Sequence, residues 1–302
     1  MQEGAFALID CLGFKGIWKR SQDNPDIVLN KLMQIDKDAK ETEGRLKAYA
    51  ENQAIKLEVN FVMLSDTIAI SAPYFPLNLD KKIEDFHKGL LVQSVCMLAS
   101  KFIQLFMLDE PYLALRGYVT FGQHSMKENF IVGPAVDEAA VNYEIADGAF
   151  VWLHPEATQM YENYKNVEKE IQQAVISKEQ KQYQVGSNSV SKEEIAELYN
   201  LNSKLPLLIE YEMPIKNGKH LDCSVINPLL LLEGGEERAE VMLNHIESFK
   251  SNDINVLIKM QNTVEFLTKA NIECEKFEEQ GLNFNWLRKV TGVEDLIDTE
   301  EN

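Results

Sequence analysis

The sequence predicts an α+β fold, with short strands in one sheet and long helices packed against it, and three observations support this prediction. Residues 5–9 form a continuous apolar run, which is typical of a central strand buried on both faces. Apolar and polar residues alternate over residues 57–61, the period of a half-buried strand. Residues 25–52 and 80–108 carry the apolar periodicity of long amphipathic helices.

The elements are expected in the order β-α-β-β-α-β. A strand over residues 5–10 precedes the first helix, and a hairpin then folds back around Ser65-Asp66. A further strand, over residues 112–121, follows the second helix. This is the ferredoxin-like, split βαβ arrangement. The other elements expected here are the hairpin strands at residues 55–64 and 67–72, later strands at 129–132 and 149–153, and a helix at 135–146.

The second half of the chain is expected to interrupt this core and then return to it. Residues 156–202 are rich in Lys, Glu and Gln and are predicted to be a solvated helical insertion, with Ser191 and Glu194 forming a capping box. The core, residues 1–155, is completed by residues 203–230, where Asn217-Gly218 predicts a hairpin between strands at 205–215 and 220–226. Residues 231–302 are predicted to be a C-terminal helical segment, with a helix over 237–270.

Charge and cysteine content restrict the class of protein. A net charge of −18 argues against binding to long nucleic acid, but divalent cations can still carry a single nucleotide into an acidic site. The four cysteines have no metal-ligand spacing and fit reduced thiols of a cytoplasmic protein. No signal peptide or membrane insertion is expected, because polar residues interrupt the longest apolar region, residues 90–108.

Asp10 and Asp66 are the candidate catalytic pair. Each lies where an apolar strand meets a turn, so its carboxylate can stay accessible on a rigid base. Two such carboxylates on neighbouring strands suit Mg²⁺, which prefers oxygen ligands and keeps substrate phosphate in its coordination shell. The alternative interpretation is two strand-end acids that face water.

Four segments resemble the class III nucleotidyl cyclases. Residues 6–14 carry an aspartate before a Gly-Phe pair, and residues 61–69 are similar to that family's metal-binding hairpin, with Ser65 in place of the usual Gly. Residues 115–118 and 131–139 resemble a later strand and helix start of stand-alone bacterial members. The resemblance covers about residues 5–155, with a weaker match at residues 225–229.

The resemblance implies a head-to-tail homodimer in which each active site is built from both chains. Asp10, Asp66 and the backbone carbonyl of Cys11 would hold two divalent ions, Mn²⁺ or Mg²⁺. Backbone amides through Gly13 and Phe14 would meet the metal and the triphosphate. The ribose 3′-hydroxyl would then attack the α-phosphate and expel pyrophosphate.

Several positions depart from the family pattern. Val62 and Phe130 stand where many members carry the lysine and acid that read a purine, and an apolar Phe130 could narrow the pocket toward a pyrimidine. Asp137 and Val141 stand where the transition-state Asn and Arg are expected. Asn142 and Arg116 are the candidates to replace them, because Arg neutralises charge on phosphate oxygens. An ion pair with one of the chain's acids is the alternative for Arg116.

This combination of residues resembles most closely the pyrimidine cyclases of bacterial antiphage Pycsar systems. The resemblance implies that UTP, in preference to CTP, is converted to a 3′,5′-cyclic monophosphate that activates a separate effector protein. Two alternatives stay open: a purine cyclase that reads its base with other residues, and a catalytically weak nucleotide-binding or scaffold protein on the cyclase fold.

Overall fold

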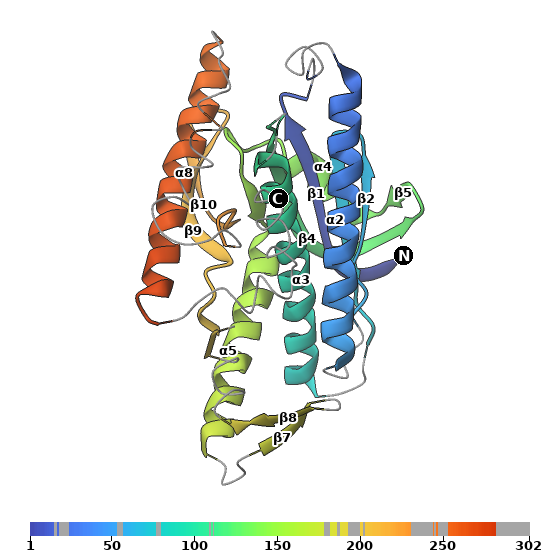
Figure 1. The fold of residues 1–302 in the computed structure, drawn as a ribbon, viewed down its shortest axis with the longest axis vertical. Helices are drawn as coiled ribbons and strands as arrows, with labels where there is room; N and C mark the ends of the chain where they lie inside the picture. Colours follow the sequence, from blue (N-terminus) through green and yellow to red (C-terminus); the bar gives the residue numbers. More distant parts are fainter. Residues whose placement is uncertain are drawn as a thin grey trace, which may run out of the picture.

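The computed structural model describes residues 1–14, 17, 24–52, 57–76, 80–108, 110, 112–177, 182–185, 188–192, 200–201, 203–230, 244, 246 and 253–281. An eight-stranded sheet forms the centre, with the strand order β2-β3-β1-β4-β6-β10-β9 and with β5 paired to β4. The long helices cross this sheet, as Figure 1 shows. The predicted α+β fold is therefore confirmed.

The first half of the chain forms the predicted ferredoxin-like core. Its elements are β1 (Gln2–Leu12), α2 (Pro25–Asn52), β2 (Asn60–Leu64), β3 (Thr67–Pro73), α3 (Lys81–Leu108) and β4 (Ala114–Lys127). The strands lie in the order β2-β3-β1-β4 with every neighbouring pair antiparallel. The two β-α-β halves therefore interleave, which is the split βαβ pattern.

The two faces of this sheet are covered differently. The ring of Phe61 on β2 packs edge-on against Phe102 of α3, with 5.1 Å between ring centroids. Side chains alternate along a strand, so the residues on either side of Phe61 point to the opposite face. On that face the hydroxyl of Thr120 in β4 donates to Glu138 of α4 (Pro134–Asn142) over 2.7 Å. Helices α3 and α4 therefore lie on opposite faces.

Helix α3 is the central helix of the core. By length and composition, Lys81–Met107 could cross a membrane, contrary to the expectation from its interrupting polar residues, but its most apolar window is completely buried in the protein. Two of its buried polar side chains donate hydrogen bonds to backbone carbonyls. Ser100 Oγ donates to the Asn227 carbonyl over 2.9 Å, and Gln104 Nε2 donates to the Pro228 carbonyl over 3.1 Å. They tie α3 to the chain that follows β10.

The remaining strands extend the sheet beyond β4. They are β5 (Phe130–Val132), β6 (Val151–Leu153), β9 (Leu208–Ile215) and β10 (Lys219–Ile226), and β6 runs parallel to β4. The predicted turn joins β9 and β10, with Gly218 at φ 73°, a left-handed conformation that glycine adopts without a steric penalty.

The segment predicted as a solvated helical insertion differs from that expectation in two ways. Helix α5 (Pro155–Ser177) buries Tyr161 and Tyr164 against the core and packs on α3. Beyond it, β7 (Gln182–Val185) and β8 (Asn188–Ser191) form a separate hairpin. Ser191 ends β8 and directly precedes Lys192, which is helical, so it lies at the position of an N-cap, while Glu194 of the expected capping box lies outside the described residues.

The C-terminal segment contains helix α8 (Ile254–Glu278), capped by the Asp253 side chain. Phe266 of α8 packs against Phe150 and Tyr211, with ring centroids 5.5 Å and 5.0 Å away. Within the expected helix over residues 237–270, Asn244 and Ile246 are also helical, but Asp253 is not, so the helix is interrupted before α8, and α8 ends later than predicted.

Candidate functional site

Asp10 and Asp66 come together at one end of the sheet. Asp10 pairs with Thr67, and Asp66 lies in the turn just before Thr67, between β2 and β3. The Cys11 amide donates to the Asp66 carbonyl over 2.8 Å and fixes this turn against β1. The two predicted carboxylates thus stand at adjoining strand ends.

The turn that carries Asp66 has an unusual backbone. Ser65 adopts φ 61°, in the left-handed region where a side chain is disfavoured. This is the position at which the sequence departs from the usual Gly of the resembling hairpin. Glycine adopts this conformation without a steric penalty, whereas here a serine adopts it.

Arg116 occupies the space beside Asp10. The two residues are partners in the β1–β4 register, and the guanidinium donates to Asp10 Oδ2 from Nη2 over 3.1 Å and from Nε over 3.3 Å. Burial raises the pKa of the Asp10 carboxyl above its ordinary value, and the hydrogen bond and charge of Arg116 oppose that rise. The ion-pair alternative for Arg116 is therefore what the structure contains, with the candidate metal ligand as the acid.

Three residues that the sequence analysis did not identify complete this cluster. Glu144 lies 3.5 Å from Arg116 Nη2 and 3.6 Å from Lys216 Nζ, and it accepts from the Tyr143 hydroxyl over 3.1 Å. The Tyr143 hydrogen bond, then the charges of Lys216 and Arg116, lower the pKa of Glu144. Lys216 follows β9, far from Asp10 in the sequence, so no local pattern could have placed it here.

The residues at this end of the sheet fit a divalent ion that keeps water and phosphate in its shell. Among the described residues there is no cluster of three or more His, Cys, Asp and Glu side chains. Mg²⁺ needs no such cluster, because it is usually bound by one or two carboxylates plus substrate phosphate. The guanidinium of Arg116 contacts Asp10 Oδ2, so an ion held by that oxygen would take the place of this contact. Gly13, at φ 73°, turns the chain directly after β1, so the turn of the predicted phosphate ligands Gly13 and Phe14 adjoins the carboxylates.

The other predicted substrate-binding residues lie elsewhere in the chain. The Phe130 side chain is 76% exposed on β5, and Asp137 is exposed on α4. Asn142 Nδ2 donates to the Glu138 carbonyl of its own helix over 2.9 Å. Val62 lines a cavity on the face of the sheet opposite α3. Phe130 does not line that cavity, so within one chain it does not narrow it.

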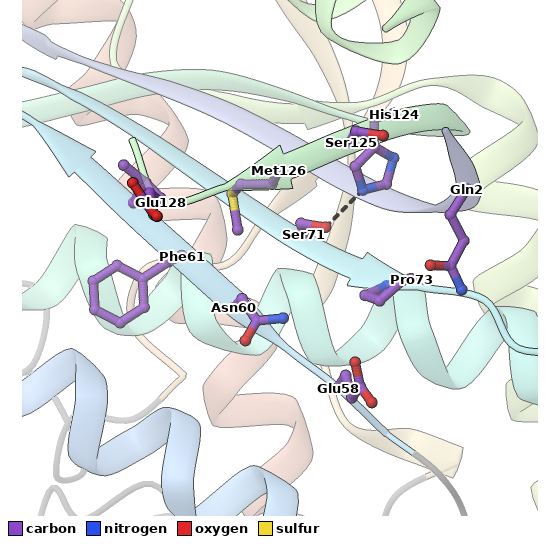
Figure 2. A pocket seen from close by; sticks show the side chains of 11 residues that line it. Gln2, Glu58, Asn60, Phe61, Ser71, Pro73, His124, Ser125, Met126 and Glu128 are labelled. Carbon is purple, nitrogen blue, oxygen red and sulfur yellow. Dashed lines mark hydrogen bonds between the residues drawn. The ribbon is translucent and has the colours of Figure 1, made fainter. Parts of the chain in front are cut away.

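This cavity measures about 450 Å³ and contains a buried hydrogen bond that the sequence did not indicate. Ser71 Oγ and His124 Nε2 are 2.6 Å apart, and both side chains are buried (Figure 2). Ser71 and His124 are 53 residues apart in the sequence, so no local pattern pairs them. The cavity is lined by Gln2, Glu58, Asn60, Phe61, Val62, Ser71, Pro73, His124, Ser125, Met126 and Glu128.

Comparison with known proteins gives similarity at the level of structure alone. No protein-family model matches the chain, and no curated protein matches it. The guanylyl cyclase Cya2 is 12% identical, with a TM-score of 0.30, over 53% of this chain and 81% of its own. The adenylyl cyclase CyaB from P. aeruginosa is 13% identical, with a TM-score of 0.31, over 63% of this chain and 91% of its own.

Proposed function

We propose that this chain is a metal-dependent nucleotidyl cyclase. It converts a pyrimidine nucleoside triphosphate, UTP in preference to CTP, into the 3′,5′-cyclic monophosphate and pyrophosphate. The observation that carries the proposal is the 2.8 Å hydrogen bond from the Cys11 amide to the Asp66 carbonyl, which holds two carboxylates at adjoining strand ends. The resemblance of residues 6–14 and 61–69 to the metal-binding segments of class III cyclases supports it.

In this proposal the chain's own residues bind and orient the triphosphate. Asp10, Asp66 and the Cys11 carbonyl would hold two divalent ions, Mg²⁺ or Mn²⁺, which would supply activation of the 3′-hydroxyl and charge for the leaving pyrophosphate. Amides of the turn at Gly13 and Phe14 donate to phosphate oxygens. The hydroxyl oxygen forms a bond to the α-phosphorus as the bond to pyrophosphate breaks.

Arg116 has a separate role in the proposed reaction. Its Nη2 lies 3.1 Å from Asp10 Oδ2 and 3.5 Å from Glu144 Oε1. The guanidinium can therefore lose its contact with one carboxylate and retain its contact with the other. With Asp10 engaged as a metal ligand, the guanidinium would be available to donate to phosphate oxygens, for which its planar fork is suited. Lys216, 3.6 Å from Glu144, brings a second cation to the same place.

We also propose that the enzyme works as a homodimer in the cytoplasm and that its product activates a separate effector in antiphage defence. The resemblance supports the whole of this statement. For the dimer there is additional support in the exposed apolar side chains of Phe130, Val132 and Val141 on β5 and α4, which give a second copy an apolar surface to cover.

The experiment that tests the function is product analysis by mass spectrometry. The purified chain is incubated with Mn²⁺ or Mg²⁺ and with ATP, GTP, CTP or UTP separately. A cyclic pyrimidine product together with pyrophosphate is the expected result. A cyclic purine would keep the reaction and overturn the substrate. Turnover of none of the four, by a folded dimer, would overturn the enzyme and favour a nucleotide-binding protein.

A further inference from the structure

The cavity lined by β2 and β3 contains hydrogen-bonding side chains whose positions are fixed by the strand pairing. Asn60 on β2 and Ser71 on β3 are partners in the strand register, so their side chains stand next to each other on the same face. Leu64, Thr67 and Asp10 are likewise register partners on neighbouring strands. They lie four residues away from Asn60 and Ser71, which is roughly 13 Å along the strands. The cavity therefore lies beside the carboxylates and not among them.

The hydrogen of each group in the Ser71–His124 pair can be assigned from its partners. His124 Nδ1 is 3.1 Å from the Gly122 carbonyl, which can only accept, so Nδ1 carries the proton. Burial lowers the pKa of His124, which keeps the ring neutral and leaves Nε2 as an acceptor. The Ser71 hydroxyl must then donate to Nε2, and its lone pairs remain to accept from a ligand.

Whereas Ser71 presents an acceptor to the cavity, Asn60 presents a hydrogen-bond donor. Its Oδ1 accepts from Lys47 Nζ over 3.3 Å, and because an ammonium can only donate, the amide cannot be flipped. The amide nitrogen of Asn60 is therefore the group turned to the other side. The cavity thus presents a donor and an acceptor from adjacent strands, as Figure 2 shows for Asn60 and Ser71.

The charge of the lining excludes the phosphate end of a nucleotide. No Lys or Arg is present among the described residues that line the cavity, while Glu58 and Glu128 both are. A phosphate would meet carboxylates there, and the cation next to the lining, Lys47 beside Asn60, is already paired with Glu43. An uncharged planar ring with a ring N–H beside a carbonyl, as in uracil, matches the lining instead.

We propose that this cavity binds the nucleobase of the substrate and that Asn60 and Ser71 are its specificity-determining residues, with His124 as the positioning residue for Ser71. This inference rests on the proposed function and deepens it. The donor of Asn60 meets a carbonyl on the base edge, and Ser71 accepts from the neighbouring ring N–H, a pair of groups that adenine does not present. In this proposal, Asn60 and Ser71 read the base. They replace the lysine and the acid that many class III cyclases carry at the positions of Val62 and Phe130.

The test combines turnover with binding of nucleosides, which need neither metal nor catalysis. The variants are Asn60→Leu, Ser71→Ala and, as a control on the exposed end of α5, Ser177→Ala. Selectivity is measured as kcat/KM for UTP and CTP relative to ATP, and thermal unfolding shows that each variant is folded. Uridine, cytidine and adenosine are the probes for saturation-transfer NMR of the wild type and the variants.

We expect Asn60→Leu to lower the pyrimidine preference about tenfold or more, because one hydrogen bond to the base is lost, and to weaken the nucleoside NMR signal. Ser71→Ala is expected to act in the same direction, and Ser177→Ala to change neither quantity. Unchanged selectivity and unchanged nucleoside binding in both cavity variants would overturn the inference while cyclisation stands. Absence of cyclisation together with nucleoside binding that depends on Asn60 would support the cavity and overturn the proposed reaction.

Discussion

Asp66 carries the sharpest prediction at the residue scale. Replacing it by Asn removes a charge with almost no change of shape. If Asp66 is a metal ligand, turnover should fall by about 10³-fold or more, because the metal contributes several kcal/mol to the transition state. Thermal unfolding should be unchanged, because the contact that anchors the turn is made by the Asp66 backbone carbonyl.

The matched control is Asp222→Asn, an exposed carboxylate on β10. It should keep full turnover and lose the same formal charge. Full turnover in Asp66→Asn would move the metal site elsewhere, and equal losses in the two variants would point to net charge instead of ligation.

His124 yields a prediction about pH. Burial lowers the pKa of His124 below its ordinary value. As the pH falls, His124 is therefore protonated in the unfolded chain at a pH at which it is still neutral in the folded protein. Stability should therefore fall as the pH decreases below about 6.5, the usual pKa of histidine in an unfolded chain. His124→Gln removes this contribution.

Urea unfolding of the wild type and His124→Gln at several values of pH measures it. The free energy of unfolding of the wild type should drop more steeply between about pH 7 and pH 5.5 than that of the variant. Parallel curves would mean that His124 titrates alike in the folded and unfolded chain, and would remove the basis for a neutral ring beside Ser71.

At the scale of elements, alanine substitutions at two glycines test how closely two helices are packed. Gly44 on α2 is exposed and a Cβ there would meet nothing within 4 Å, whereas a Cβ on Gly89 of α3 would lie 2.3 Å from the Met160 carbonyl oxygen of α5. Gly44→Ala should stabilise the protein by about 0.5–1 kcal/mol through helix propensity. Gly89→Ala should destabilise it by about 1–3 kcal/mol, because backbone must move.

Chemical denaturation of the two variants measures the difference. Equal stabilisation of both would mean that α5 does not contact α3 at Met160 and that the segment after residue 155 is the solvated excursion that its composition suggested. The buried Tyr161 and Tyr164 predict the opposite.

At the scale of the whole molecule, the proposed head-to-tail dimer can be tested by mixing. If a site takes its metal ligands from one chain and its base cavity from the other, Asp66→Asn mixed with the double variant Asn60→Leu/Ser71→Ala should form heterodimers with one intact site. Half of the dimers are then mixed and each has one of two sites, so turnover should recover to about a quarter of the wild-type value.

Each variant alone is the control and should stay at its own low turnover. If the Asp66 carboxylate and the cavity of the same chain serve one site, mixed dimers contain no intact site and nothing is regained. That result would rule out the shared site and leave the cavity assignment in place.

Periodicity and turn residues are local, and the elements that depend on them were predicted well. The apolar run at residues 5–9 became the buried centre of β1, and residues 25–52 became α2 with the same bounds. Asn217-Gly218 formed its turn. The β7–β8 hairpin was missed, since residues 182–191 are polar and lack a clear alternation.

The sequence by itself determined the α+β order of elements and the position of Asp10 and Asp66 at strand ends, because both follow from patterns within a few residues. Only the tertiary structure decided what surrounds them. Arg116 meets Asp10 through strand register, Lys216 joins them through Glu144, and Ser71 meets His124 across the sheet. Such partners are distant in the chain, and their contact depends on how the strands pair, which no local pattern records.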